Sequence, residues 1–134
     1  MLNQLHVQTE RHTQMIDITQ AVQDCVRQAG IINGMVLVYC PHTTAAITIN
    51  ENADPDVVHD MLKRLEDLYP WKVSGDLHRE GNSAAHLKAS TLGASQLIPL
   101  ENGRLVLGTW QGIYFCEFDG PRRRSYYVKV LADR

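Results

Sequence analysis

The stretch LHREGNSAAHLKASTLG, from Leu77 to Gly93, is the part of the chain around which we expect the fold to be organised. Ser83 is a good helix N-cap, because its hydroxyl accepts hydrogen bonds from backbone N–H groups of the following turn. Gly93 is a good helix end, because glycine readily adopts the left-handed conformation. The stretch therefore predicts a polar loop that leads into a short helix, roughly Ala84 to Leu92.

The same stretch carries the densest set of reactive side chains in the sequence. His78 is expected on the loop, and His86 in the first turn of the helix. A helix start offers free backbone N–H groups to anions, so the turn at Gly81, Asn82 and Ser83 predicts an anion-binding site. Lys88 is a candidate catalytic cation, but it lies farther along the helix, so the backbone turn is the stronger prediction.

Strands dominate the rest of the chain, above all its second half. Apolar runs and period-two alternation predict strands near Leu5–Thr9, Gln14–Ile18, Met35–Cys40, Ala45–Asn50, Ser95–Leu100, Arg104–Gly108, Gly112–Phe118 and Ser125–Leu131. Asn102-Gly103 is a hairpin signal. The runs on either side of the PHTT segment are predicted to be adjacent strands, or one strand that a bulge interrupts.

Two further helices are predicted upstream. One starts at Asp17 or Thr19 and ends near Ala29, and the other starts at Asp54-Pro55 and ends near Tyr69. With about three helices and about six to eight strands, the chain is predicted to be a single α+β domain, residues 1–134, with a largely antiparallel sheet or sandwich.

Composition excludes several classes of protein. The chain has 134 residues, 44% hydrophobic and 21% charged, as in ordinary globular domains. The net charge of −2 argues against general nucleic-acid binding. No apolar run approaches the length of a membrane span, and the N-terminus lacks the apolar segment of a signal peptide. The three cysteines form no C-x-x-C motif, and we expect them to be reduced, in the cytoplasm.

His42, in the segment PHTTA, is a third histidine expected at the end of an element. Three imidazoles from His42, His78 and His86 would suit a divalent metal, zinc above all, and leave one position open for water or substrate. The alternative is that His42 is a structural histidine near the core. We interpret His6, His12 and His59 as structural.

Other polar side chains are open to two interpretations. Glu51 follows an apolar strand, where a carboxylate can act as a general base or hold a metal-binding histidine, or be an ordinary loop residue. Gln111 lies between two glycines and either points its amide at a ligand or belongs to a hairpin corner. The run Arg122–Arg124 is either a solvated strand edge or a phosphate contact.

Three long motifs resemble the YjbQ-like family, which is associated with secondary thiamine-phosphate synthase activity. They are HTTAAITINENADPD, the histidine-containing stretch ending in EGNSAAHLKASTLG, and LGTWQGIYFCEFDGPRRR. The resemblance covers Gly34 to the C-terminus. It implies a small α+β protein that forms homotrimers, with His42, His78 and His86 meeting at one metal site. The motifs also include Glu51, Asn52, Asp54, Ser83, Lys88, Trp110 and Gln111.

The sequence therefore predicts a metal-assisted enzyme that acts on a small anionic or phosphorylated molecule. The resemblance implies the condensation of a pyrimidine-methyl diphosphate with a thiazole phosphate, which releases pyrophosphate. Two alternatives stay open. One is a zinc-dependent hydrolase, and the other is a metal-stabilised trimeric binding module without turnover.

Overall fold

The computed structural model describes all 134 residues and contains three helices and eight strands. The elements in chain order are β1 (Leu2–Gln8), β2 (Gln14–Asp17), α1 (Thr19–Ala29), β3 (Gly34–Tyr39), β4 (Ala45–Glu51), α2 (Pro55–Leu68), α3 (Ser83–Leu92), β5 (Ser95–Glu101), β6 (Arg104–Leu105), β7 (Gln111–Glu117) and β8 (Arg123–Ala132). The predicted α+β class with antiparallel sheets and three helices is confirmed.

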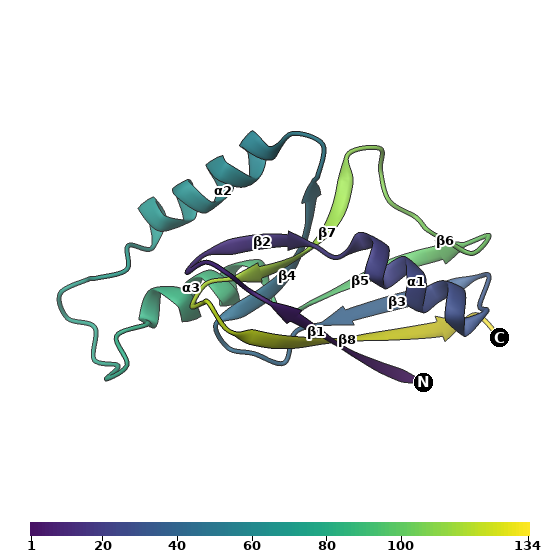
Figure 1. The fold of residues 1–134 in the computed structure, drawn as a ribbon, viewed down its shortest axis with the longest axis horizontal. Coiled ribbons are helices and arrows are strands. Elements are labelled where there is room, and N and C mark those ends of the chain that lie inside the picture. The colour runs from purple at the N-terminus through teal and green to yellow at the C-terminus, as the bar shows by residue number, and fades with distance from the viewer.

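The strands form two antiparallel sheets (Figure 1). Sheet A has five strands in the order β1-β8-β3-β5-β6, and sheet B has three in the order β2-β7-β4. The predicted relation between the runs beside PHTT is wrong, because β3 lies in sheet A and β4 in sheet B. The segment Pro41–Thr44 therefore carries the chain from one sheet to the other.

Strand β7 explains the layering, because its side chains are buried on both faces. Ile113 and Phe115 pack with Val36 and Val128 of sheet A in the main core. Tyr114, Cys116 and Phe118 face the other way, into a second core that also contains alanines of α3. Sheet B is consequently sandwiched between sheet A and a helical layer, which is why the GIYFCEF run is continuously apolar.

The helix boundaries differ slightly from the predicted ones. Helix α1 follows Ile18, and the carboxylate of Asp17 accepts hydrogen bonds from the N–H and hydroxyl of Thr19. Helix α2 begins as predicted, with Asp54 capping the N–H of Asp56. Ser83 is the first residue of α3 rather than its cap, and the cap position belongs to Asn82, which makes no side-chain capping bond. None of the three helices is long and apolar enough to cross a membrane.

The outer face of sheet A is unusually apolar. Met35, Tyr39, Leu97 and Leu131 are each between 38% and 53% exposed on this face. The strand registers place Met35 opposite Leu131 and Leu37 opposite Leu97. Leu37 lies between Met35 and Tyr39 on the same face of β3. These apolar side chains surround the exposed Lys129, which lies opposite Leu37, and an exposed apolar patch of this kind is characteristic of a protein–protein interface.

We propose that copies of the chain associate through this outer face, as the trimer implied by the family resemblance. Leu97→Lys places a charge within the face, so we expect it to shift the assembly towards monomer in multi-angle light scattering. Leu68→Lys is the matched control, since Leu68 is 62% exposed but lies on α2. A wild-type protein that is monomeric at micromolar concentration would contradict the proposal.

Candidate functional site

A polar cleft lies at the end of the sandwich where the β7–β8 turn, the β3–β4 connection and the start of α3 meet. It has a volume of about 380 Å³. Its lining is Pro41, His42, Thr43, Thr44, His78, Glu80, Asn82, His86, Asp119, Arg122 and Arg124. The structure therefore brings all three predicted metal-binding histidines to one cleft, together with Asn82 of the predicted anion site.

His42 is held by the edge of β8. Strand β3 ends at Tyr39, so it does not pair with the backbone of Ser125 in β8, and the His42 imidazole contacts that backbone instead. Nε2 of His42 lies 3.0 Å from the amide nitrogen of Ser125 and 3.1 Å from its carbonyl oxygen. Both contacts use the same ring nitrogen, so Nε2 either accepts from the N–H or donates to the carbonyl, depending on the tautomer. The other ring nitrogen, Nδ1, makes no hydrogen bond within the chain.

The surroundings of His42 keep its imidazole neutral. Burial is the main cause that lowers the pKa of His42 below its usual value of 6.5, and the charge of Arg124 lowers it further. The contact with the Ser125 carbonyl acts in the opposite direction and does not outweigh them. A neutral imidazole is the form that binds metals and accepts protons.

His78 and His86 form a pair at the mouth of the cleft. Their ring centroids are 5.4 Å apart, with the planes at 86°. His78 is exposed on the loop before α3, and His86 is half-buried in the helix. The chain contains no group of three or more His, Cys, Asp or Glu side chains placed to hold a metal ion, so the three histidines share a cleft without forming a ligand set.

A buried ion pair forms the floor of the cleft. Arg124 donates from Nε to Glu117 Oε1 at 2.8 Å and from Nη2 to Glu117 Oε2. The same Nη2 donates to the hydroxyl of Thr44 at 2.8 Å. Burial alone would raise the pKa of Glu117, but hydrogen bonds from Arg124, the Asp119 amide and the Thr9 hydroxyl hold it below its usual range.

Asn82 connects the start of α3 to the β7–β8 turn. Its Nδ2 donates to Asp119 Oδ2 at 2.8 Å and lies 3.5 Å from Glu80 Oε2. Its Oδ1 is the one buried side-chain polar atom without a hydrogen-bond partner. The carboxylates fix the orientation of the amide, since turning it over would bring two acceptors together.

Lys88 does not reach the cleft. Its side chain is 1% exposed, and its ammonium group lies 2.6 Å from Glu66 Oε1 of α2. Burial alone would raise the pKa of Glu66, but hydrogen bonds from Lys88 and the Trp71 N–H lower it. The helical position of Lys88 points it at α2, so we interpret it as the ionic link between α2 and α3 rather than a catalytic residue.

Glu51 and Gln111 also lie away from the histidines. They pair across β4 and β7 at the opposite end of these strands from Thr44, roughly 20 Å away at strand spacing. Gln111 Oε1 accepts from the Gly108 N–H at 2.8 Å, which is the hairpin-corner interpretation. Ser83 is the first residue of α3 and does not line the cleft.

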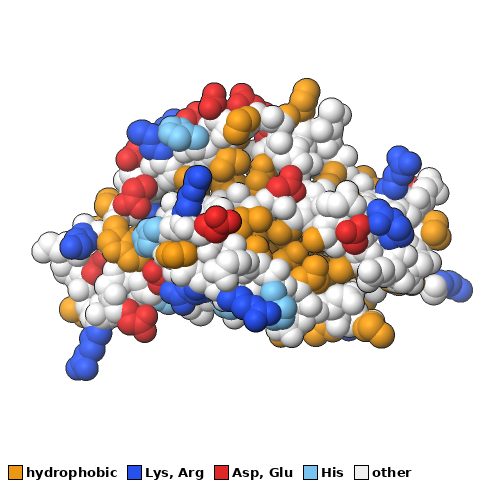
Figure 2. Space-filling view, in the orientation of Figure 1, with side chains coloured by type: hydrophobic (Ala, Val, Ile, Leu, Met, Phe, Trp, Pro, Cys, Tyr) orange, Lys and Arg blue, Asp and Glu red, His pale blue; other side chains and the backbone are white.

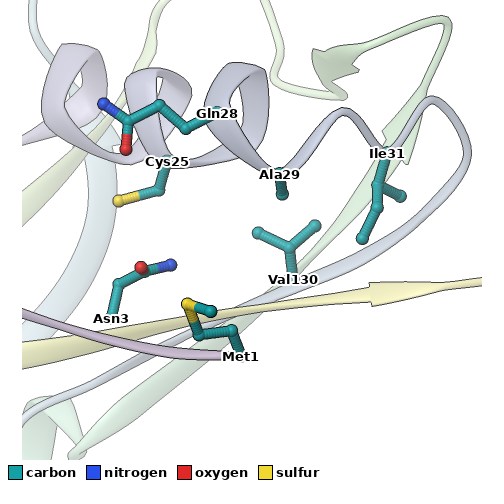
Figure 3. A pocket seen from close by; sticks show the side chains of 7 residues that line it. All are labelled: Met1, Asn3, Cys25, Gln28, Ala29, Ile31 and Val130. Atoms are coloured by element: carbon teal, nitrogen blue, oxygen red, sulfur yellow. The ribbon is translucent and has the colours of Figure 1, made fainter.

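Two other cavities have different linings. One of about 690 Å³ lies under α2 and contains the motif residues Asn52 and Asp54. Figure 2 shows apolar side chains at the surface below this helix, and no residue of α2 itself is fully buried. Another, of about 440 Å³, lies between α1 and the N-terminal strand (Figure 3). Cys25 faces it, and burial raises the pKa of this thiol, which disfavours the reactive thiolate form.

Several cleft residues were not predicted. Glu80 and Asp119 are carboxylates inside motifs, next to residues that were singled out, but nothing local marks them as facing the histidines. Arg124 was named only within the run Arg122–Arg124, as a possible phosphate contact. Strand alternation would have singled it out, because it has the same parity as the apolar Tyr126 and Val128, and therefore an inward direction.

The sequence profile described as "UPF0047 protein YjbQ-like" matches residues 3–133. The chain belongs to this YjbQ-like family. It is 60% identical over 131 residues to the UPF0047 protein YugU of Bacillus subtilis strain 168, covering 98% of this chain and 99% of that protein. It is also 46% identical over 136 residues to the UPF0047 protein MJ1081 of Methanocaldococcus jannaschii, covering 100% of this chain and 96% of that protein.

Solved structures of the YjbQ-like family share the fold. A YjbQ/UPF0047 protein of Clostridium acetobutylicum superimposes with a TM-score of 0.94 at 54% identity, covering 96% of this chain and 99% of that one. A YbjQ-like protein of unknown function from Sulfolobus solfataricus P2 gives the same TM-score at 36% identity, covering 99% and 97%.

Replacement of Glu66 tests the interpretation of Lys88. In Glu66→Gln the buried ammonium group loses its counter-charge, so we expect the free energy of unfolding to fall by about 1–3 kcal/mol in urea titrations. Asp67→Asn is the control, because Asp67 pairs with Lys63 at the surface and its loss changes stability little. If Glu66→Gln is as stable as wild type, Lys88 is not held by this pair.

Acid should destabilise metal-free protein partly through His42. Because the pKa of His42 is lower in the folded state, the unfolded chain takes up the proton first as the pH falls below 6.5, and the free energy of unfolding decreases. We therefore expect the free energy of unfolding of His42→Asn to decrease less than that of the wild type between about pH 8 and about pH 5. An NMR titration in which the His42 imidazole protonates at or above 6.5 would contradict it.

Proposed function

We propose that this YjbQ-like protein is a metal-assisted enzyme that acts on a small phosphorylated molecule in the histidine cleft. The observation that carries the proposal is the meeting of three imidazoles, two guanidinium groups and two carboxylates in one polar cavity. Such a collection of ionisable groups from four separate segments is costly to assemble without a ligand. Clefts of this kind are typical of active sites.

The donor set suits a divalent metal, and zinc best, because its nitrogens belong to neutral imidazoles. His42 supports this most directly: with the proton on Nε2, it can donate to the Ser125 carbonyl at 3.1 Å and offer Nδ1 as a ligand. No three ligands are gathered in the single chain, so the proposal requires the accessible His78 and His86 side chains to turn towards His42.

A metal bound there would polarise a phosphoryl oxygen or lower the pKa of a bound water. The chain itself supplies a carboxylate, and Glu80 is better placed for this role than Glu51, because it lines the cleft. Asp119 is already engaged by Asn82 and Arg122. We therefore assign proton transfer to Glu80 rather than to Glu51 or Lys88.

Thiamine-phosphate synthesis is the specific reaction that the family resemblance implies. It needs positive charge beside the leaving diphosphate more than it needs a base. The guanidinium groups of Arg122 and Arg124 support it as hydrogen-bond donors, although each is paired with a carboxylate. Imidazole ligands do not, because a magnesium–diphosphate site normally uses oxygen ligands. Hydrolysis of a phosphate ester is the second candidate reaction, and the combination of imidazoles with Glu80 favours it.

We expect purified protein to carry about one divalent metal ion per chain, held by the three histidines. His42→Ala, His78→Ala and His86→Ala should each lower the metal content measured by elemental analysis. His59→Ala is the matched control, since this histidine is exposed on α2 far from the cleft. Unchanged metal content in all three cleft variants would remove the metal from the proposal.

Activity assays on the same variants separate the remaining alternatives. Condensation of the two thiamine precursors and hydrolysis of simple phosphate monoesters are measured with the metal-loaded protein, with Glu80→Gln as a further variant. Turnover that falls in the histidine and Glu80 variants supports the enzyme. Metal binding without either reaction supports the trimeric binding module instead.

A further inference from the structure

Two guanidinium groups face the cleft at the start of β8. Arg122, just before the strand, and Arg124, on it, both line the cavity, whereas Arg123 between them lies opposite Gln8 of β1 and does not line it. This is the alternation expected of a strand, in which neighbouring side chains point to opposite faces. The arginine run thus divides into two inward groups and one outward group.

Arg124 has one donor nitrogen that the protein does not use. Its Nε and Nη2 are taken by Glu117 and Thr44, while Nη1 makes no hydrogen bond within the chain. The side chain is only 3% exposed. Nη1 is not among the buried polar atoms that lack a partner, so it is open to the cleft that Arg124 lines, where it can donate to an acceptor brought by a ligand.

Arg122 repeats the arrangement nearer the surface. Its Nε donates to the Asp119 carbonyl at 3.0 Å, and its Nη2 lies 3.1 Å from Asp119 Oδ2. Its Nη1 also has no partner within the chain. Each arginine is therefore oriented by a carboxylate that occupies its other nitrogens, and each leaves the same nitrogen free.

We propose that Arg122 and Arg124 together bind the phosphoryl group of the substrate, each donating from Nη1. A phosphoryl group offers several acceptor oxygens at once, which suits two separate donors, whereas a neutral carbonyl offers one. This assignment rests on the proposed function for the class of substrate. It places the anion at the arginine side chains rather than at the first amides of α3.

Inorganic phosphate is the probe that tests the assignment without any turnover. In wild-type protein labelled with nitrogen-15, we expect phosphate to shift the Arg124 side-chain Nε–H signal and the Ser125 amide signal. Arg122→Gln and Arg124→Lys should each weaken phosphate binding about tenfold, the effect of losing one charge-assisted hydrogen bond. Arg123→Gln, which changes an outward arginine, should bind phosphate as the wild type does.

A second variant guards against misfolding. Arg124→Lys leaves buried Glu117 poorly paired, so the double variant Glu117→Gln, Arg124→Gln, which removes both charges, is measured beside it. Arg122 is exposed enough that Arg122→Gln is expected to fold normally. If the folded variants bind phosphate as tightly as wild type, or if phosphate shifts only the first amides of α3, the assignment is wrong.

Metal content distinguishes this inference from the proposed function. Wild-type protein that carries metal but does not bind phosphate overturns the arginine assignment alone. Protein that binds phosphate through Arg122 and Arg124 but holds no metal supports the arginine site and overturns the metal-assisted mechanism. The elemental analysis is therefore made on the same samples as the phosphate titration.

Discussion

The two sheets are joined at one end by the buried ion pair between Glu117 and Arg124. Glu117 is the last residue of β7 in sheet B, and Arg124 lies near the start of β8 in sheet A. Two threonines complete the hydrogen-bond network: Thr9, just after β1, donates to Glu117, and Thr44, just before β4, accepts from Arg124. Breaking such a pair by removing one partner leaves an uncompensated charge in the interior, which typically costs about 3–5 kcal/mol. The sandwich and the cleft therefore depend on the same contact.

This dependence fixes one half of the cleft and leaves the other half accessible. Ser125, next to Arg124 in the chain, positions the His42 imidazole. Arg124 also donates to Thr44, the last residue of the segment that carries His42. These groups lie on strands or directly beside them. His78 and Glu80 lie on an exposed loop with few partners. A ligand would thus meet preorganised groups on the strand side and bring the loop side towards itself.

The sequence predicted the fold well because the strands have apolar runs and the helices have strong start and end signals. It failed where the outcome depended on a distant partner. Lys88 looked reactive because of its neighbours in sequence, but its contact is Glu66, twenty-two positions away. The sequence also did not show that the strands on either side of PHTT belong to different sheets. That depends on the pairing of β3 with β8 and of β4 with β7, which involves distant parts of the chain. The three histidines that line the cleft were singled out because the family motifs and their polar positions at the ends of elements agreed.

The charges of the cleft nearly cancel, and this governs its selectivity. Arg124 is paired with Glu117 and Arg122 with Asp119, so the guanidinium groups do not act as free positive charges. The cleft therefore offers a ligand mainly unused N–H groups at fixed positions, beside a neutral His42. A ligand gains little from its net charge alone and much from oxygens spaced to meet these donors. The proposed phosphoryl site would therefore select its ligand by the positions of the oxygens rather than by charge.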